Sequence, residues 1–176
     1  MAQVMEWQKG ILFPLLRQQL QGTERECLDF GCGPGRFTPD LAELVGGRAV
    51  GVDPTRALLA NAPRSERVEY RLMEGGTIPA DDSSMDVVWI CLVLMCITDE
   101  RALRRSIAEI DRVLRPDGLL FLVENTEPRE NLRHLSYRSV EEYQSLFTFT
   151  ELEHVGDYHD LGERISILTG RKHRGL

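Results

Sequence analysis

A glycine-rich loop and one carboxylate are the residues in this sequence best suited to bind a ligand. Gly31, Gly33 and Gly35 directly follow the apolar run 26–30, and glycines leave room for a ligand to approach the backbone. Asp53 lies eighteen positions after Gly35, at the end of the next apolar run. A carboxylate in that place can accept hydrogen bonds from both hydroxyls of a ribose. Strand, loop, helix, strand and acid in this order predict a site for a nucleoside-bearing ligand.

The spacing of the glycines narrows the class of nucleoside ligand. The dinucleotide fingerprint G-x-G-x-x-G requires a glycine at its sixth position. Counting from Gly31, that position holds Arg36. No lysine followed by serine or threonine comes after the glycines, as a P-loop requires. The sequence therefore disfavours both a dinucleotide-binding site and a P-loop that binds the phosphates of a nucleoside triphosphate.

Short β-rich runs alternate with helical patterns along the chain, which is typical of βαβ units and a parallel sheet. We expect strands at 26–30, 48–52, 67–72, 86–92, 119–123 and two within 152–170, and helices at 3–21, after the loop to about 45, at 55–60, and after the N-caps Thr98 and Ser139. Pro14 is expected to kink the first helix or to start a second one. The last two strands have no helix between them, so they should pair antiparallel. The predicted fold is α/β, with a doubly wound, mostly parallel seven-stranded sheet, an antiparallel terminal strand and helices on both faces.

Length and composition predict a single domain over 1–176, with a helical cap at 1–22. The formal charge of −7 argues against a nucleic-acid partner, and the basic run 171–174 is expected to be a solvated tail. The most apolar run, 87–97, is shorter than a membrane span needs, and the N-terminus lacks a signal-peptide pattern. The four cysteines form no CxxC pair and are expected to be buried free thiols. These features predict a cytoplasmic protein without a membrane partner.

Four motifs in order carry a resemblance to a known family. Asp29-Phe30-Gly31-Cys32-Gly33-Pro34-Gly35, then Val52-Asp53-Pro54, then the segment 74–86, then the helix-turn-strand segment 113–119 follow one another along the chain. In this order they resemble the class I S-adenosylmethionine-dependent methyltransferases, a Rossmann-like fold, and especially the small type-11 methyltransferase domains. The resemblance covers roughly residues 27–123.

The resemblance implies S-adenosylmethionine as cofactor and S-adenosylhomocysteine as product. Asp29 and the loop backbone would meet the methionine part, Asp53 the ribose, and Glu74 the adenine amino group, where the family usually has an aspartate. Cys91 would lie near the methionyl end, and Met95-Cys96 stand where the family often has a histidine. The implied cofactor-binding set is Asp29, Gly31, Cys32, Gly33, Gly35, Asp53, Pro54, Glu74, Gly75 and Cys91.

The acceptor side is less well defined by the residues. Methyl transfer needs alignment and exclusion of water, and needs a base only when the acceptor must lose a proton. The polar segment 124–138 is long for a strand-to-helix connection and is expected to line the acceptor site. His134 is the candidate base, with a solvated loop histidine as the alternative, and the candidate substrate contacts are Glu124, Asn125, Tyr137 and Arg138. No metal site is expected, although His154 and His159 lie among carboxylates.

Taken together, these residues predict a cytoplasmic methyltransferase for an O or N atom of a small molecule, such as a metabolite, a natural product or a glycan end. The expected state is a monomer or a homodimer. One alternative is a catalytically silent cofactor-binding domain that acts as a regulator. A nicotinamide-dependent oxidoreductase is a further alternative, disfavoured by Arg36 and by the lack of a Tyr-x-x-x-Lys pair.

Overall fold

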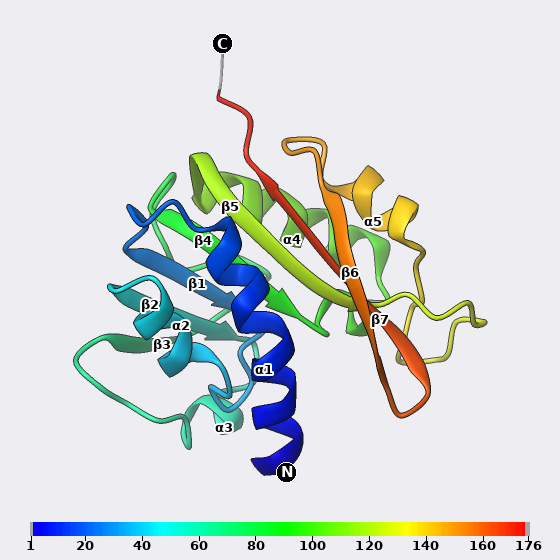
Figure 1. The fold of residues 1–176 in the computed structure, drawn as a ribbon, viewed down its shortest axis with the longest axis horizontal. Helices are drawn as coiled ribbons and strands as arrows, with labels where there is room; N and C mark the ends of the chain where they lie inside the picture. The colour runs from blue at the N-terminus through cyan, green and yellow to red at the C-terminus, as the bar shows by residue number, and fades with distance from the viewer. Residues whose placement is uncertain (1, 175–176) are drawn as a thin grey trace.

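The computed structural model describes residues 2–174, and side chains from residue 6 onward. Seven strands form one twisted sheet in the order β3-β2-β1-β4-β5-β7-β6 (Figure 1). The strands are β1 (Glu26–Phe30), β2 (Arg48–Asp53), β3 (Val68–Leu72), β4 (Met85–Cys91), β5 (Leu114–Asn125), β6 (Glu153–Asp160) and β7 (Glu163–Arg171). The expected seven-stranded α/β fold is confirmed.

The pairing directions determine where a ligand can bind. Strands β1 to β5 pair in parallel, whereas β7 pairs antiparallel with both β5 and β6. The carboxyl ends of β1 to β6 therefore meet at one edge of the sheet. The chain order reverses between β1 and β4, and open α/β sheets bind ligands at the carboxyl edge beside such a switch point.

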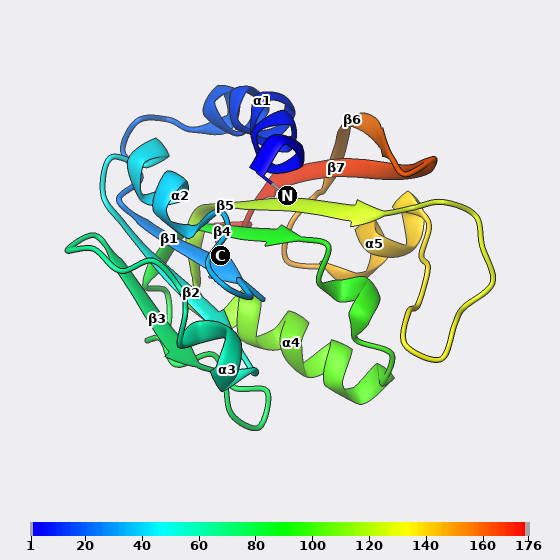
Figure 2. The same cartoon turned by 90° about the horizontal axis from the view of Figure 1, so that it is seen from below.

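Helices cover both faces of the sheet (Figure 2). The helices are α1 (Ala2–Gln19), α2 (Thr38–Leu44), α3 (Arg56–Leu59), the 3-10 turn η1 (Leu94–Cys96), α4 (Glu100–Val113) and α5 (Val140–Leu146). Apolar side chains of α1 and α2 pack on one face, and those of α4 and α5 pack on the other. Within β4, Val87 and Trp89 face α1 while Val88 and Ile90 face α4. This double burial explains the unbroken apolar run of that strand.

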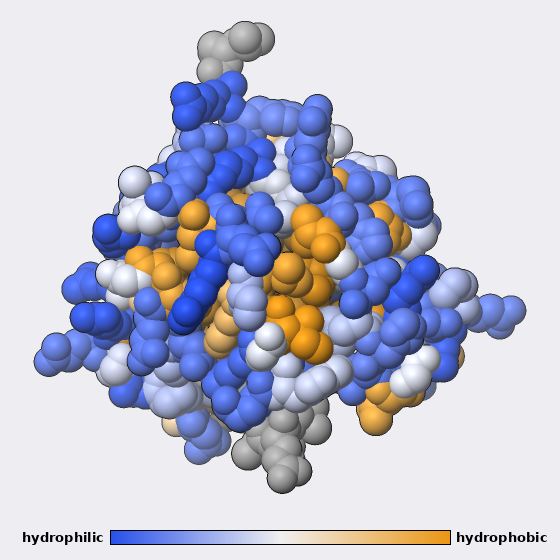
Figure 3. Space-filling view, in the orientation of Figure 1, coloured by the Kyte–Doolittle hydropathy of each residue, from blue (hydrophilic) through white to orange (hydrophobic). Residues whose placement is uncertain are grey.

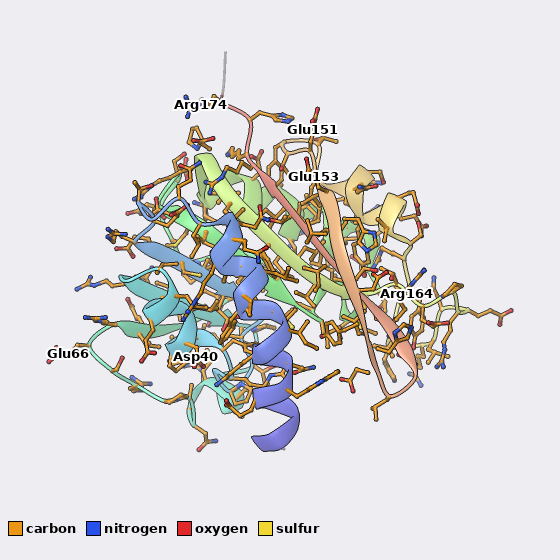
Figure 4. All side chains as sticks on the ribbon, in the orientation of Figure 1. Asp40, Glu66, Glu151, Glu153, Arg164 and Arg174 are labelled. Carbon is orange, nitrogen blue, oxygen red and sulfur yellow. The ribbon has the colours of Figure 1, made fainter. Side chains whose placement is uncertain are left out.

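Helix α1 is anchored through its middle and continues through Pro14 as one helix. Leu12 and Leu16 are fully buried, and Phe13 packs edge-on against Trp89 with ring centres 6.1 Å apart. The first half of the helix is also tied to α2, because Lys9 Nζ lies 2.8 Å from Asp40 Oδ2 (Figure 4). Apolar side chains next to α1 remain partly visible at the surface (Figure 3). Since proline lacks an N–H, the helix loses one backbone hydrogen bond near this point.

Three local expectations are corrected at helix and strand ends. Asp99, not Thr98, is the N-cap of α4, since its side chain accepts a hydrogen bond from Ala102 N at 2.8 Å. Strand β5 begins at Leu114, and residues 115–118, expected as a turn before the strand, form an irregularity within it. The expected first helix ends at Gln19 rather than at 21. The capping box of Ser139 with Glu142 at the start of α5 is confirmed.

The basic run at the C-terminus is only partly a solvated tail. Arg171 donates to the carbonyl oxygens of Gln19 and Asp117 and pairs with the buried Glu24. Lys172 Nζ pairs with Asp111 at 2.7 Å. These contacts close the sheet against α1 and α4, so the first half of the run is structural.

Two further observations concern the surface. Cys96 is exposed and Cys91 is half-buried, so only Cys27 and Cys32 match the expectation of buried thiols. Across residues 2–174, no helix is both long and apolar enough to cross a membrane.

Gly51 provides a test of packing beneath the glycine loop. A Cβ atom at this position in β2 would lie 2.7 Å from Tyr70 Cδ1 and 2.8 Å from Cys32 Sγ. We predict that Gly51→Ala lowers the free energy of unfolding by about 1–3 kcal/mol, because overpacking displaces these side chains. Urea unfolding followed by circular dichroism measures this change. The control is Gly156→Ala, whose Cβ would meet nothing within 4 Å; equal stability of the two variants would contradict the prediction.

Candidate cofactor site

A cavity of about 530 Å³ lies at the carboxyl edge of the sheet, beside the switch point. Its walls come from the glycine loop, the residues after β2 and β3, the turn after β4 and the first half of α4. Most of the lining is apolar, including Leu58, Met73, Val93 and Ile97. Asp53 is the only carboxylate among the described residues that line it. The cavity therefore combines an apolar slot with one acidic group.

The glycine loop is held close to the neighbouring strands by backbone hydrogen bonds. The N–H groups of Gly31 and Cys32 both donate to the carbonyl of Val52, at 2.8 and 3.0 Å. Gly31 has a φ of +70°, and a Cβ there would lie 2.5 Å from Val93 Cγ1. Only glycine satisfies both the left-handed backbone and this close approach. The loop thus forms a floor between the ends of β1 and β4.

Asp53 joins the glycine loop to the segment after β2. Its Oδ2 accepts a hydrogen bond from Gly33 N at 2.9 Å, and its Oδ1 accepts one from Thr55 N at 2.7 Å. The side chain is 7% exposed and forms part of the cavity wall. The carboxylate is therefore fixed in place at the cavity, next to Pro54, as a ribose contact requires.

Asp29 lies beneath the loop instead of in the cavity wall. Its carboxylate accepts a hydrogen bond from the Thr38 hydroxyl at 2.6 Å, which ties β1 to the start of α2. Burial raises the pKa of Asp29 to about 7, opposed by the Thr38 bond and by the charge of Arg36. In this arrangement Asp29 supports the loop, and its implied contact with the methionine part stays a prediction.

The structure separates the two residues expected at the adenine end. Gly75 lines the cavity, and Arg105 Nη1 donates to its carbonyl oxygen at 2.9 Å. The side chain of Glu74 is exposed and lies 3.6 Å from Arg56 Nη2 in an ion pair. Ser106, which is buried on α4, faces the cavity instead. Sequence reasoning missed Arg105 and Ser106 because they are brought here by packing and not by a motif.

The turn after β4 is shaped by two residues that were expected to contact the acceptor. Glu124 is fully buried, and its carboxylate accepts hydrogen bonds from the backbone N–H groups of Val93 (2.9 Å) and Leu94 (2.7 Å). Arg138 donates from Nη1 to the carbonyl oxygen of Leu94 at 3.1 Å. Together they clamp η1, which places Val93 against Gly31. In this structure they position the cavity wall, and their expected contacts with the acceptor stay a prediction.

The remaining acceptor-side candidates do not converge on the cavity. Asn125 is buried, with its amide donating to Glu163 and its Oδ1 accepting from Glu127 N at 2.9 Å. Tyr137 is half-buried and His134 is exposed in the connection from β5 to α5. Asn125 thus holds the base of this connection, and the proposed role of His134 stays a prediction.

The two cysteines of the implied site lie outside the cavity wall. Cys32 is buried beneath Gly51, where the backbone of β2 leaves space for its sulfur. Cys91, at the end of β4, faces the α1 side of the sheet, and burial raises the pKa of its thiol to about 12. Both thiols are therefore protonated near neutral pH, and their implied contacts with the cofactor stay a prediction.

Comparison with known proteins identifies the family. Residues 28–122 match the family described as "Methyltransferase domain", a span that contains the glycine loop, Asp53 and Gly75. The chain belongs to this family. S-adenosylmethionine is the cofactor that this family and fold imply. The residues present fit that group, because one buried carboxylate and an apolar slot stand beside a loop with free approach to its backbone.

Individual relatives and structures agree with this family. A demethylmenaquinone methyltransferase of Lactobacillus johnsonii is 33% identical over 143 residues, which are 74% of this chain and 56% of that protein. The thiol S-methyltransferase TMT1B of Rattus norvegicus is 30% identical over 166 residues, covering 87% and 62% respectively. The chain thus spans little more than half the length of these relatives. A crystal structure of a SAM-dependent methyltransferase from Methanosarcina mazei superposes with a TM-score of 0.76 at 20% identity, over 91% of this chain and 97% of that one.

The buried Glu124 carboxylate predicts a measurable pH dependence of stability. Burial raises its pKa to about 7 from an ordinary 4.5, against the hydrogen bonds from the η1 backbone. Between pH 4.5 and 7 the folded protein keeps a proton that the unfolded chain has released. The free energy of unfolding therefore falls as pH rises through this window, by up to about 3 kcal/mol from this group.

We predict that Glu124→Gln, which cannot ionise, makes the fall in the free energy of unfolding smaller by the contribution of Glu124, whatever its absolute stability. Asp29, whose pKa burial also raises to about 7, keeps its own contribution in both proteins. Urea unfolding measured from pH 4.5 to 8 gives the slope for each protein. Glu130→Gln, which removes an exposed carboxyl from the same connection, should keep the wild-type slope. A Glu124→Gln slope that matches wild type would show that this carboxyl does not titrate in the window.

Proposed function

We propose that this protein transfers the methyl group of S-adenosylmethionine to a small-molecule acceptor. The observation that carries the proposal is the fixed Asp53 carboxylate beside the glycine loop, in a cavity at the switch point of the sheet. In an open α/β fold, that combination suits a ribose-bearing ligand. Family membership supports the same assignment.

The chain's own residues bind and orient the reactants and exclude water from them. When bound, S-adenosylmethionine would supply an electrophilic methyl carbon on a sulfonium: the nucleophile of the acceptor would bond to that carbon while the carbon–sulfur bond breaks and the neutral thioether leaves with the bonding pair. Asp53 would accept hydrogen bonds from the ribose hydroxyls, and the apolar side chains of Leu58, Met73 and Val93, which line the cavity, would keep water away from the base. The η1 turn, fixed by Glu124 and Arg138, sets the distance between the cavity wall and the glycine loop. Holding the reactants in line supplies most of the rate enhancement that such a displacement needs.

We infer that the acceptor presents an O or N nucleophile. We also infer that the protein acts in the cytoplasm as a monomer or homodimer. The relatives named above act on different acceptors, a demethylmenaquinone and a thiol, so neither acceptor transfers directly to this chain. His134 in the β5–α5 connection is the proposed base if the acceptor must lose a proton.

The cofactor assignment is tested by removing the Asp53 carboxylate. We predict micromolar binding of S-adenosylmethionine and S-adenosylhomocysteine to the wild type, and a loss of at least about tenfold in Asp53→Ala, equivalent to about 1.4 kcal/mol. Isothermal titration calorimetry measures both affinities, and circular dichroism checks that the variant folds. The control Glu66→Ala removes an exposed carboxyl far from the cavity (Figure 4) and should bind normally.

The same series of titrations includes NADH, the cofactor that the alternative oxidoreductase function would require. NADH should show no binding, because Arg36 stands where the dinucleotide loop needs glycine. NADH binding without S-adenosylhomocysteine binding would reverse the assignment in favour of an oxidoreductase.

A further inference from the structure

A cluster of polar side chains lies beneath α1 on the side of the glycine loop away from the cavity. We name it the α1 polar cluster; it consists of Gln8, Arg36, Tyr158 and Asp160. Gln8 is 1% exposed and Tyr158 is 6% exposed, whereas Arg36 and Asp160 are half-buried. Its members come from α1, from the residue after Gly35 and from the end of β6, three segments that meet at the carboxyl edge of the sheet.

Arg36 has a neutral partner where a cation normally has a carboxylate. Its Nη1 donates to Gln8 Oε1 at 3.1 Å, and its guanidinium lies 4.4 Å from the centre of the Phe37 ring. Among residues 2–174, Arg36 forms no ion pair within 4.0 Å. Asp160 is reached only through Gln8, whose Nε2 donates to Asp160 Oδ2 at 3.4 Å. A half-buried guanidinium held by an amide oxygen retains most of its capacity to bind an anion.

Tyr158 supplies a second unused donor in the same place. Its hydroxyl is buried and has no hydrogen-bond partner, which is uncommon for a buried polar atom. Tyr158 precedes Asp160 by two residues, so both lie on one face of β6. Its ring meets Trp7 of α1 edge-on with centres 5.5 Å apart, next to Gln8, which donates to Asp160. A cationic donor whose acceptor is a neutral amide oxygen, together with a hydroxyl that has no partner, indicates a site for a carboxylate or another small anion.

The position of this cluster relative to the cavity identifies the anion. Asp53 binds Gly33 on the cavity side of the loop, and Arg36 directly follows Gly35 at the other end of the same loop. A ligand whose ribose is held at Asp53 and whose chain crosses the loop reaches Arg36 with its far end. In S-adenosylmethionine that far end is the amino acid, which carries the only carboxylate of the molecule.

We propose that Arg36 binds the carboxylate of the methionine part of S-adenosylmethionine, with the hydroxyl of Tyr158 as a second donor. Gln8 holds the guanidinium in place and yields its hydrogen bond to the incoming carboxylate. The exchange replaces a neutral acceptor with a charged one, and a planar guanidinium matches a carboxylate with two parallel hydrogen bonds. This inference rests on the proposed function and assigns the residues that recognise one end of its cofactor.

The test compares two ligands that differ only in the carboxylate. S-adenosylhomocysteine and its decarboxylated analogue are titrated calorimetrically into wild type and variants. The wild type should prefer S-adenosylhomocysteine by at least tenfold. Arg36→Gln should weaken S-adenosylhomocysteine by ten- to hundredfold and change the affinity of the decarboxylated analogue less than twofold, so that the preference disappears. Arg36→Lys should keep part of the preference, and Tyr158→Phe should reduce it severalfold.

A matched control and a folding check complete the design. Arg48→Gln removes an exposed arginine at the opposite end of β2 and should leave both affinities unchanged. Thermal unfolding confirms that each variant folds; if Arg36→Gln does not fold, the comparison rests on Arg36→Lys and Tyr158→Phe. Equal weakening of both ligands would show that Arg36 only supports the loop, and an unchanged preference would place the carboxylate elsewhere. Either result overturns the inference alone, whereas a wild type that binds neither ligand overturns the proposed function with it.

Discussion

The hydrogen bond between the Asp53 carboxylate and Gly33 N–H is the contact on which the geometry of the site depends. It forms because β1 and β2 are parallel neighbours in which Phe30 pairs with Val52. This register brings the two carboxyl ends to the same level. The carboxylate then fixes both the glycine loop and, through Thr55 N, the start of the next segment. One side chain thus joins two segments of the cavity wall and supplies the only carboxylate among the described residues that line it.

Two buried carboxyl groups show how the fold holds the rest of this edge. Asp29 binds the Thr38 hydroxyl below the loop, and Glu124 binds the backbone of η1 beside it. Burial raises the pKa of both to about 7, so each is held at a cost in stability when ionised. The cost is offset where these groups supply hydrogen bonds that a loop or a short turn cannot make within itself.

The cavity and the α1 polar cluster lie on opposite faces of the sheet. The cavity opens on the side covered by α4, where Arg105 and Ser106 complete its wall, whereas the α1 polar cluster lies on the side covered by α1. The glycine loop passes between the two at the edge of β1. An elongated ligand with an apolar base at one end and a carboxylate at the other matches this division, since each end meets a chemically different environment.

Local sequence patterns alone determined the class of fold and the residues of the nucleoside site. Alternating apolar runs predicted the strands, and the order of glycines and Asp53 predicted a nucleoside site, because both are encoded by neighbouring residues along the chain. Only the tertiary structure decided what Glu124 and Arg138 do, since their partners are backbone groups about 30 and 40 residues away that no motif marks. The same holds for Gln8, which reaches Asp160 across 152 positions. The sequence shows which residues carry a carboxylate or a guanidinium. Whether such a group contacts a ligand or a buried backbone group depends on which elements pack against it.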